Sequence, residues 1–322
     1  MTFFSAFSGA GGLELALRDH TCVGYSEIDR AALAVYRHHF PDHPPYGDIQ
    51  QLDPRNVAPF DLLVAGFPCQ AYSVAGQRRG FADARGALFF DLARFIAAKR
   101  PRLLLLENVR GLLSHGHGQT FALVLAVLDD LGYDCQWEVR HAREYTAQDR
   151  RRLFLIGHRR GTRRPEVFPL ATRRPQVPLI PVTRNRGVWT PREDVTTIDA
   201  SYGKGIDNRG QRTALLIPPA RRRHVLVQRP RGKNAGRTRT CAPTITRGAG
   251  DGNLALRRGA RLRRLTPREC ERLMTWPDDW TRFGRRDDGK LVELSDRARY
   301  TLCGNGVVTA TVRPILDHLT HA

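Results

Sequence analysis

Residues 61–73 read DLLVAGFPCQAYS, an apolar stretch that ends in a Phe-Pro pair and then Cys69. Pro68 fixes the backbone and has no amide hydrogen for a sheet, so we expect Cys69 just beyond a strand, on a loop. A free cysteine there is often only a small buried hydrophobe. The other interpretation is a nucleophile at the carboxyl edge of a parallel sheet, where open α/β folds bind their ligands.

Three charged side chains are suited to the same site. Glu107 follows four leucines, where partial burial would raise its pKa and let it donate a proton to a ring nitrogen. A salt bridge capping the sheet is the alternative. In QDRRRLF (148–154), Arg150 and Arg152 fall on one side of a predicted strand because side chains alternate. Two arginines suit a phosphate or a base edge, although solvated charges at a sheet edge are the commoner case.

The turn AFSGAGGLE (6–14) has three glycines between a predicted strand and a predicted helix, which lets the backbone approach a ligand closely. Its spacing is not GxGxxG, so a nicotinamide dehydrogenase is a poor fit. Glu27, at the end of the next strand, is placed to accept hydrogen bonds from ribose hydroxyls. Taken alone, it is equally an ordinary surface acid.

Apolar strands alternate with helices around these residues, which predicts an α/β fold with a doubly wound, mostly parallel sheet. The predicted strands are residues 2–7, 22–29, 61–66, 103–108 and 152–157. The predicted helices are residues 13–19, 30–40, 87–100, 121–132 and 265–276, with Pro267 in a tolerated first turn. From 158 to 264 this pattern gives way to short strand-like pieces among turns.

The charge of the chain is concentrated in one block. The formal net charge is +20, yet residues 1–157 hold 17 basic and 17 acidic side chains, and residues 265–322 hold 9 of each. Residues 158–264 hold 26 basic against 6 acidic side chains. A GC-rich genome explains why only 4 of the 52 basic residues are Lys, but it does not explain the loss of acids from one block. The block therefore indicates a polyanionic partner such as nucleic acid.

The six cysteines form no CxxC pair, so neither a metal site nor a disulfide framework is expected. The amino terminus has no basic leader, Glu14 interrupts its apolar stretch, and no apolar run is long enough to span a membrane. We expect a reduced, cytoplasmic and nucleoid-associated protein that is not bound to a membrane.

These stretches together resemble the DNA cytosine-5 methyltransferases, in the order typical of that family. The matching segments are FSGAGG, EID at 27–29, GDI at 47–49, GFPCQAYS, RGALFFDLAR, ENV at 107–109, QDRRR, RLTPRECERLMTWPDDW and GNGVV at 304–308. They span nearly the whole chain, and only the stretch around Cys69 would be specific alone. One departure is Gly306, where the family more often has Ala or Ser.

The resemblance implies a mechanism. A Cys69 thiolate would add to carbon 6 of cytosine and turn the ring into an enamine that attacks a methyl group. Since a thiol of ordinary pKa is only a few per cent ionised at neutral pH, a nearby cation should matter, and Arg152 is the candidate. Glu107 would contact ring nitrogen 3 and the exocyclic amine. S-adenosylmethionine would be the methyl donor, and double-stranded DNA the substrate.

The family's binding residues carry over by motif. Phe7, Gly9, Ala10, Gly12 and Ile28 would line the donor site, Glu27 would hold its ribose, and Asp48 with Ile49 its adenine. The same site would be completed by Phe67, Leu88, Asn305 and Val307. Residues 70–86 resemble the loop that closes over an extruded cytosine. The residues expected to reach DNA are Gln70, Ser73, Arg78, Arg79, Thr244, Ile245 and Arg247.

We predict a catalytic domain at 1–157, a target-recognition domain at 158–299 with the basic block at 158–264, and a segment at 300–322 that returns to the catalytic domain. A monomer is expected, paired in function with a restriction endonuclease. Two alternatives remain open: a tRNA cytosine-5 methyltransferase of the related branch, and a catalytically inert DNA-binding relative.

Overall fold

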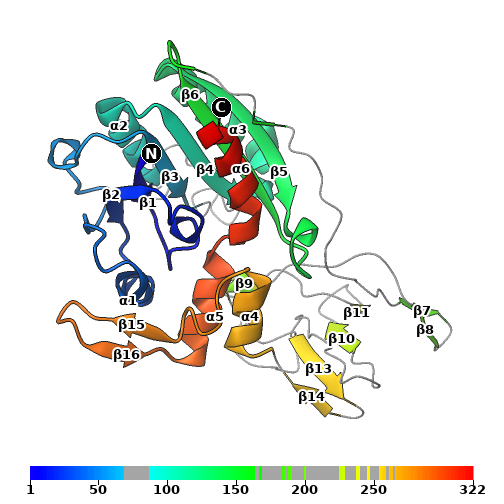
Figure 1. Cartoon of the computed structure of the whole chain (residues 1–322). Helices are drawn as coiled ribbons and strands as arrows, with labels where there is room; N and C mark the ends of the chain where they lie inside the picture. The colour runs from blue at the N-terminus through cyan, green and yellow to red at the C-terminus, as the bar shows by residue number, and fades with distance from the viewer. Residues whose placement is uncertain are drawn as a thin grey trace.

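The computed structural model describes residues 1–68, 87–163, 167–168 and 265–321, together with the backbone of eight short strands between residues 183 and 263. A six-stranded sheet in the order β2-β1-β3-β4-β6-β5 forms its centre (Figure 1). The strands are β1 (Thr2–Ala6), β2 (Thr21–Ser26), β3 (Leu62–Gly66), β4 (Leu103–Val109), β5 (Tyr133–His141) and β6 (Arg151–Arg159). β1 to β4 pair in parallel, and β6 pairs antiparallel with both β4 and β5. The predicted doubly wound, mostly parallel sheet is confirmed.

Both faces of this sheet are covered by helices, which explains why its central strands, β3 and the first half of β4, are continuous apolar runs rather than alternating. Leu104 and Leu106 of β4 pack in one cluster with α2 (Ala87–Lys99) and α3 (Gln119–Asp130). Leu103 and Leu105 pack in another with α6 (Thr309–His321), the red helix of Figure 1. The run of four leucines therefore serves two cores, and the residue that follows it, Glu107, lies at the end of a fully buried strand.

One predicted element differs from the structure, and one strand of the central sheet was missed. The helix predicted at residues 13–19 is only a 3₁₀ turn, Glu14–Ala16, because Leu13, Leu15, Leu17 and the acid between them are all buried, so no face is left for solvent. β5 was not predicted at all. As an edge strand it pairs on one side only, and most of its residues are half-buried, so its sequence mixes polar and apolar residues without a clear pattern.

A third core joins the two ends of the chain. It contains residues of α1 (Arg30–His39), α4 (Pro267–Leu273) and α5 (Asp296–Asn305). A hairpin of β15 (Phe283–Arg285) and β16 (Leu291–Glu293) lies against α1, and a Cβ on Gly284 would come within 2.7 Å of Ala34. Residues 265–299 thus share a core with residues 10–40, although the predicted boundary placed them in the recognition domain. The division into domains stays a prediction.

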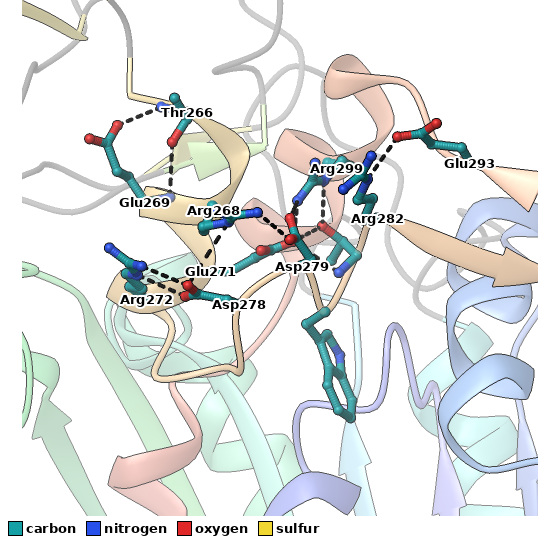
Figure 2. Close-up of polar contacts among 12 residues, drawn as sticks. Thr266, Arg268, Glu269, Glu271, Arg272, Asp278, Asp279, Arg282, Glu293 and Arg299 are labelled. Carbon is teal, nitrogen blue, oxygen red and sulfur yellow. Dashed lines mark hydrogen bonds and ion pairs between the residues drawn. The ribbon is translucent and has the colours of Figure 1, made fainter.

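Helix α4 begins as its sequence predicts. The Thr266 hydroxyl accepts a hydrogen bond from the Glu269 amide, the Glu269 carboxylate accepts one from the Thr266 amide at 2.7 Å, and Pro267 occupies the first turn (Figure 2). None of the described helices is long and apolar enough to cross a membrane.

Short strands occupy part of the basic block, as expected for that region. They are β7 (Thr183–Asn185), β8 (Val188–Thr190), β9 (Asp199–Ala200), β10 (Val225–Gln228), β11 (Arg237–Arg239), β12 (Ile245–Thr246), β13 (Leu254–Arg258) and β14 (Arg261–Arg263). β11, β10, β13 and β14 form an antiparallel sheet, and β9 pairs with β12 beside α5.

Candidate active site

Glu107 and Arg152 meet at the carboxyl end of β4. The register pairs Val109 with Arg152 on β6, and the Arg152 Nε atom lies 2.9 Å from a Glu107 carboxylate oxygen. Both side chains are largely buried, with 14% and 13% of their surfaces exposed. Burial raises the pKa of Glu107, and the charges of Arg152 and Arg150 oppose that rise. Glu107 is therefore both a buried acid with a raised pKa and the partner of Arg152 in a salt bridge. The two interpretations of Glu107 from the sequence, a proton donor and a salt bridge at the sheet edge, are both compatible with this geometry.

The strand that leads to Cys69 ends beside Glu107. Gly66, the last residue of β3, is paired with Glu107 in the register, and a Cβ on Gly66 would lie 3.5 Å from the Glu107 carboxylate. Phe67 follows, buried against Phe89 of α2 at a ring distance of 5.5 Å. Cys69 lies outside the described residues, two positions further on, so its approach to Glu107 and Arg152 stays a prediction.

Arg150 has a different environment from Arg152. It precedes β6, which begins at Arg151, so the alternation that would place both arginines on one side does not extend to it. Its side chain is buried, and its guanidinium donates to the carbonyls of Gly304, at 3.0 Å, and Gly306. Arg150 therefore holds the turn that carries Asn305, and its predicted contact with substrate stays a prediction.

Asn108 is a positioning residue that the sequence interpretation missed. Its side-chain amide donates to the Phe67 carbonyl at 3.0 Å, and its side-chain oxygen accepts from the Val109 amide at 2.8 Å. It is 3% exposed, so these bonds form away from water, where leaving a polar group unpaired is costly. The signal was present in the ENV motif, because a polar residue inside a buried strand needs a partner. Asn108 ties the end of β3 to the end of β4.

The glycine-rich turn and Glu27 lie in direct contact. Phe7, Gly9 and Gly11 all have positive φ angles, of 55°, 58° and 84°. The Gly9 amide donates to one Glu27 carboxylate oxygen at 2.8 Å, and the amides of Ile28 and Asp29 donate to the other. A carboxylate oxygen can accept two hydrogen bonds, and the oxygen bonded to Gly9 accepts only that one from the described residues, so Glu27 retains capacity for a ribose hydroxyl. Ile28 is 68% exposed beside it.

A second loop lies against the end of β2. The Ser26 hydroxyl donates to the Gly47 carbonyl at 2.6 Å, which brings Asp48 and Ile49 close to Glu27 in the fold. Asp48 accepts from the Gln50 amide at 3.0 Å, and Ile49 is buried in the core on the α2 side of the sheet. The loop therefore holds Asp48 at the same edge of the sheet as Glu27.

The remaining predicted donor-site residues divide into packed and exposed positions. A Cβ on Gly12 would lie 3.1 Å from both Val307 and Trp276, so this glycine allows close packing of the turn on the C-terminal segment. Ala10 is buried, Leu88 is half-buried against the core, and Asn305 is exposed. Of the predicted DNA contacts, Ile245 is described only as backbone of β12. The others lie outside the described residues: Gln70, Ser73, Arg78, Arg79, Thr244 and Arg247.

Glu14 is a second buried acid that the sequence interpretation did not assign. It is 1% exposed, directly behind the glycine-rich turn, and accepts a short hydrogen bond from the Ser5 hydroxyl. Its other carboxylate oxygen has no hydrogen-bond partner. Burial raises the pKa of Glu14 to about 7. The sequence did contain a signal for this buried acid, because Glu14 lies inside the apolar run GGLELAL.

The model of the C-5 cytosine-specific DNA methylase family matches residues 1–321, which is nearly the whole chain. This chain belongs to that family. The predicted family is confirmed. The enzyme class and S-adenosylmethionine as methyl donor are what membership of this family implies. The residue assignments within this methylase stay predictions.

Relatives and solved structures agree with this membership. The methylase is 32% identical over 321 residues to type II methyltransferase M.HhaI of Haemophilus parahaemolyticus, covering 96% of this chain and 90% of that protein. It is 44% identical over 171 residues to type II methyltransferase M.NgoBV of Neisseria gonorrhoeae, a match that spans 48% of this chain and only 40% of that relative. A DNMT2 mutant of Spodoptera frugiperda has the same fold, with a TM-score of 0.63, 18% identity and 99% of each chain covered.

Proposed function

We propose that this methylase transfers a methyl group from S-adenosylmethionine to carbon 5 of a flipped-out cytosine in a specific double-stranded DNA sequence, through a covalent bond to Cys69. The observation that carries the proposal is the buried Glu107, ion-paired with Arg152 beside the strand that leads to Cys69. The Cys69 thiolate adds to carbon 6, carbon 5 takes the methyl group, and loss of the carbon 5 proton and of Cys69 restores the ring.

The roles of the two charged residues follow from their environment. Burial raises the pKa of Glu107, so its carboxyl group retains a proton more readily and donates it to ring nitrogen 3. That hydrogen bond draws electrons from carbon 6, where the thiolate attacks. Arg152 is the cation that favours ionisation of Cys69, and its bond to Glu107 holds the acid in place.

The described residues fit S-adenosylmethionine, which supplies an electrophilic methyl group when bound. Glu27 would accept from its ribose hydroxyls, and Asp48 would accept from its adenine amine. The exposed Ile28 offers an apolar contact to the adenine ring. The left-handed turn at Gly9 and Gly11 lets the backbone approach the ligand without a Cβ.

DNA recognition is assigned to the basic block. Its 26 basic against 6 acidic side chains give the charge that phosphates attract, and arginines there would read guanines in the major groove. Flipping the target base costs a few kcal/mol, which the closing loop at 70–86 would offset. A partner restriction endonuclease, a monomeric state and a cytoplasmic, nucleoid-associated location remain parts of this proposal.

A duplex carrying 5-fluorocytosine at the target tests the proposal, because loss of the final proton is blocked. The complex should survive denaturing electrophoresis only with S-adenosylmethionine present, and Cys69→Ala should abolish both trapping and methylation. Glu107→Gln should slow methylation by about 10²-fold or more, since an amide cannot donate a comparable proton. Cys22→Ala is the matched control, because burial raises the pKa of Cys22 to about 12.

Three results would contradict parts of the proposal. Methylation by Cys69→Ala at the parent's rate would remove the nucleophile from the mechanism. Trapping on a tRNA substrate but not on duplex DNA would support the tRNA alternative. Site-specific DNA binding with neither trapping nor methylation would support the inert relative.

A further inference from the structure

Trp280 links the segment after the basic block to the glycine-rich turn. Its side chain is 2% exposed, and its indole Nε1 donates to the Ala10 carbonyl at 2.9 Å, across 270 positions of the sequence. The His39 ring stacks on the indole with centroids 3.6 Å apart and planes 2° from parallel. The His39 Nε2 atom also donates to the Trp280 carbonyl at 2.6 Å. The indole is thus held both by its ring and by its backbone.

The residues on either side of Trp280 are held by a polar network that is buried at Glu271 and Arg299 and exposed at Arg268 (Figure 2). Asp279 has a left-handed backbone, with φ of 61°, and its carboxylate pairs with Arg268 and, at 3.2 Å, with Arg299. Glu271 is fully buried and accepts from Arg299 and from the Thr281 amide, both at 2.9 Å. A non-glycine residue in the left-handed region persists only where its surroundings hold it. This network therefore maintains the bend that points Trp280 at the turn.

A second side chain holds the same turn. The Thr309 hydroxyl at the start of α6 donates to the Gly12 carbonyl at 2.8 Å. The peptide unit is planar, so a held carbonyl also fixes the direction of the next amide. The two bonds thereby orient the Gly11 and Leu13 amides, and they direct the Ala10 and Gly12 carbonyls toward the C-terminal segment.

We propose that Trp280 is a positioning residue for the methyl-donor site. By holding the Ala10 carbonyl, it keeps the left-handed turn in the conformation that binds S-adenosylmethionine, and Thr309 assists by holding the Gly12 carbonyl two residues further on. The inference rests on the proposed function, because it requires the glycine-rich turn to form the donor site. It adds that the donor site is completed by residues that lie beyond the basic block in sequence and do not touch the donor.

The test compares Trp280→Phe with Tyr300→Phe in the full chain. Tyr300 donates from its hydroxyl to the Leu265 carbonyl at 2.5 Å in the same core, so each variant loses one buried hydrogen bond to a carbonyl. Equilibrium dialysis with S-adenosylmethionine should give a Kd about threefold to tenfold higher for Trp280→Phe, and an unchanged Kd for Tyr300→Phe. KM for S-adenosylmethionine should rise to a similar extent, while kcat at saturating donor and KM for DNA stay unchanged.

Thr309→Val is the second variant, should Trp280→Phe fail to fold. It removes only the hydroxyl bond to Gly12 and should also raise the Kd for S-adenosylmethionine severalfold. If the unmodified chain binds the donor and Trp280→Phe binds it equally well, Trp280 has a structural role only and the inference is wrong. If Trp280→Phe does not fold, an unchanged Kd for Thr309→Val overturns it. Absence of donor binding by the unmodified chain would instead refute the proposed function.

Discussion

Substitution of Glu14 by Gln should remove a pH dependence of stability that originates directly behind the glycine-rich turn. Burial raises the pKa of this carboxyl from 4.5 to about 7, so between these values the folded state binds a proton that the unfolded state has released. Stability therefore falls as the pH rises from about 4.5 through about 7. A shift of that size corresponds to about 3 kcal/mol at ~1.4 kcal/mol per pKa unit.

Urea unfolding at pH 5, 6, 7 and 8 measures this effect. The parent should lose up to about 3 kcal/mol of stability, relative to Glu14→Gln, between pH 5 and pH 8. The comparison isolates Glu14 because all other titrating groups are common to both proteins. Burial also lowers the pKa of His39 from 6.5 to about 4, so His39 makes both proteins more stable as the pH rises through this interval, and its contribution cancels in the comparison. Parallel pH profiles for the two proteins would show that Glu14 does not titrate as its burial implies.

Two further substitutions test the packing of the C-terminal segment by thermal or urea unfolding. Arg299→Met should lower the free energy of unfolding by about 3–5 kcal/mol, because it leaves the fully buried Glu271 without its cation. Arg272→Met is the control and should have little effect, because its ion pair with Asp278 is exposed. Equal losses of stability in the two variants would contradict the burial of the Arg299–Glu271 pair. Gly306→Ala should cost about 1–3 kcal/mol, because a Cβ there would lie 2.5 Å from the Trp276 ring, and Trp276→Leu in the same chain should recover part of the loss. If Gly306→Ala leaves the free energy of unfolding unchanged, the Trp276 ring can move aside and the expected clash does not occur.

Local patterns predicted much of the sheet and of the acid site. Four leucines before Glu107 implied a buried strand end, and the structure confirms both the strand and the raised pKa of its carboxyl. The departure at Gly306 was visible in the sequence, but no local pattern could show that a neighbouring tryptophan occupies the space of a Cβ. Likewise, the contacts of Arg150 with Gly304 and of Trp280 with Ala10 join residues more than 150 positions apart. Such contacts depend on how the elements pack, which periodicity does not encode.

The long-range contacts have a common form, in which a buried side chain donates to a backbone carbonyl of a site loop. Asn108 holds Phe67 ahead of Cys69, Arg150 holds the turn around Asn305, and Trp280 holds Ala10 in the donor turn. Loops at the carboxyl edge of a sheet carry the reacting groups but have few hydrogen bonds of their own. A donor anchored in the core supplies the missing bond without occupying the ligand's space. This arrangement explains how the donor turn keeps its left-handed residues on either side of Ala10, Gly9 and Gly11, in fixed positions.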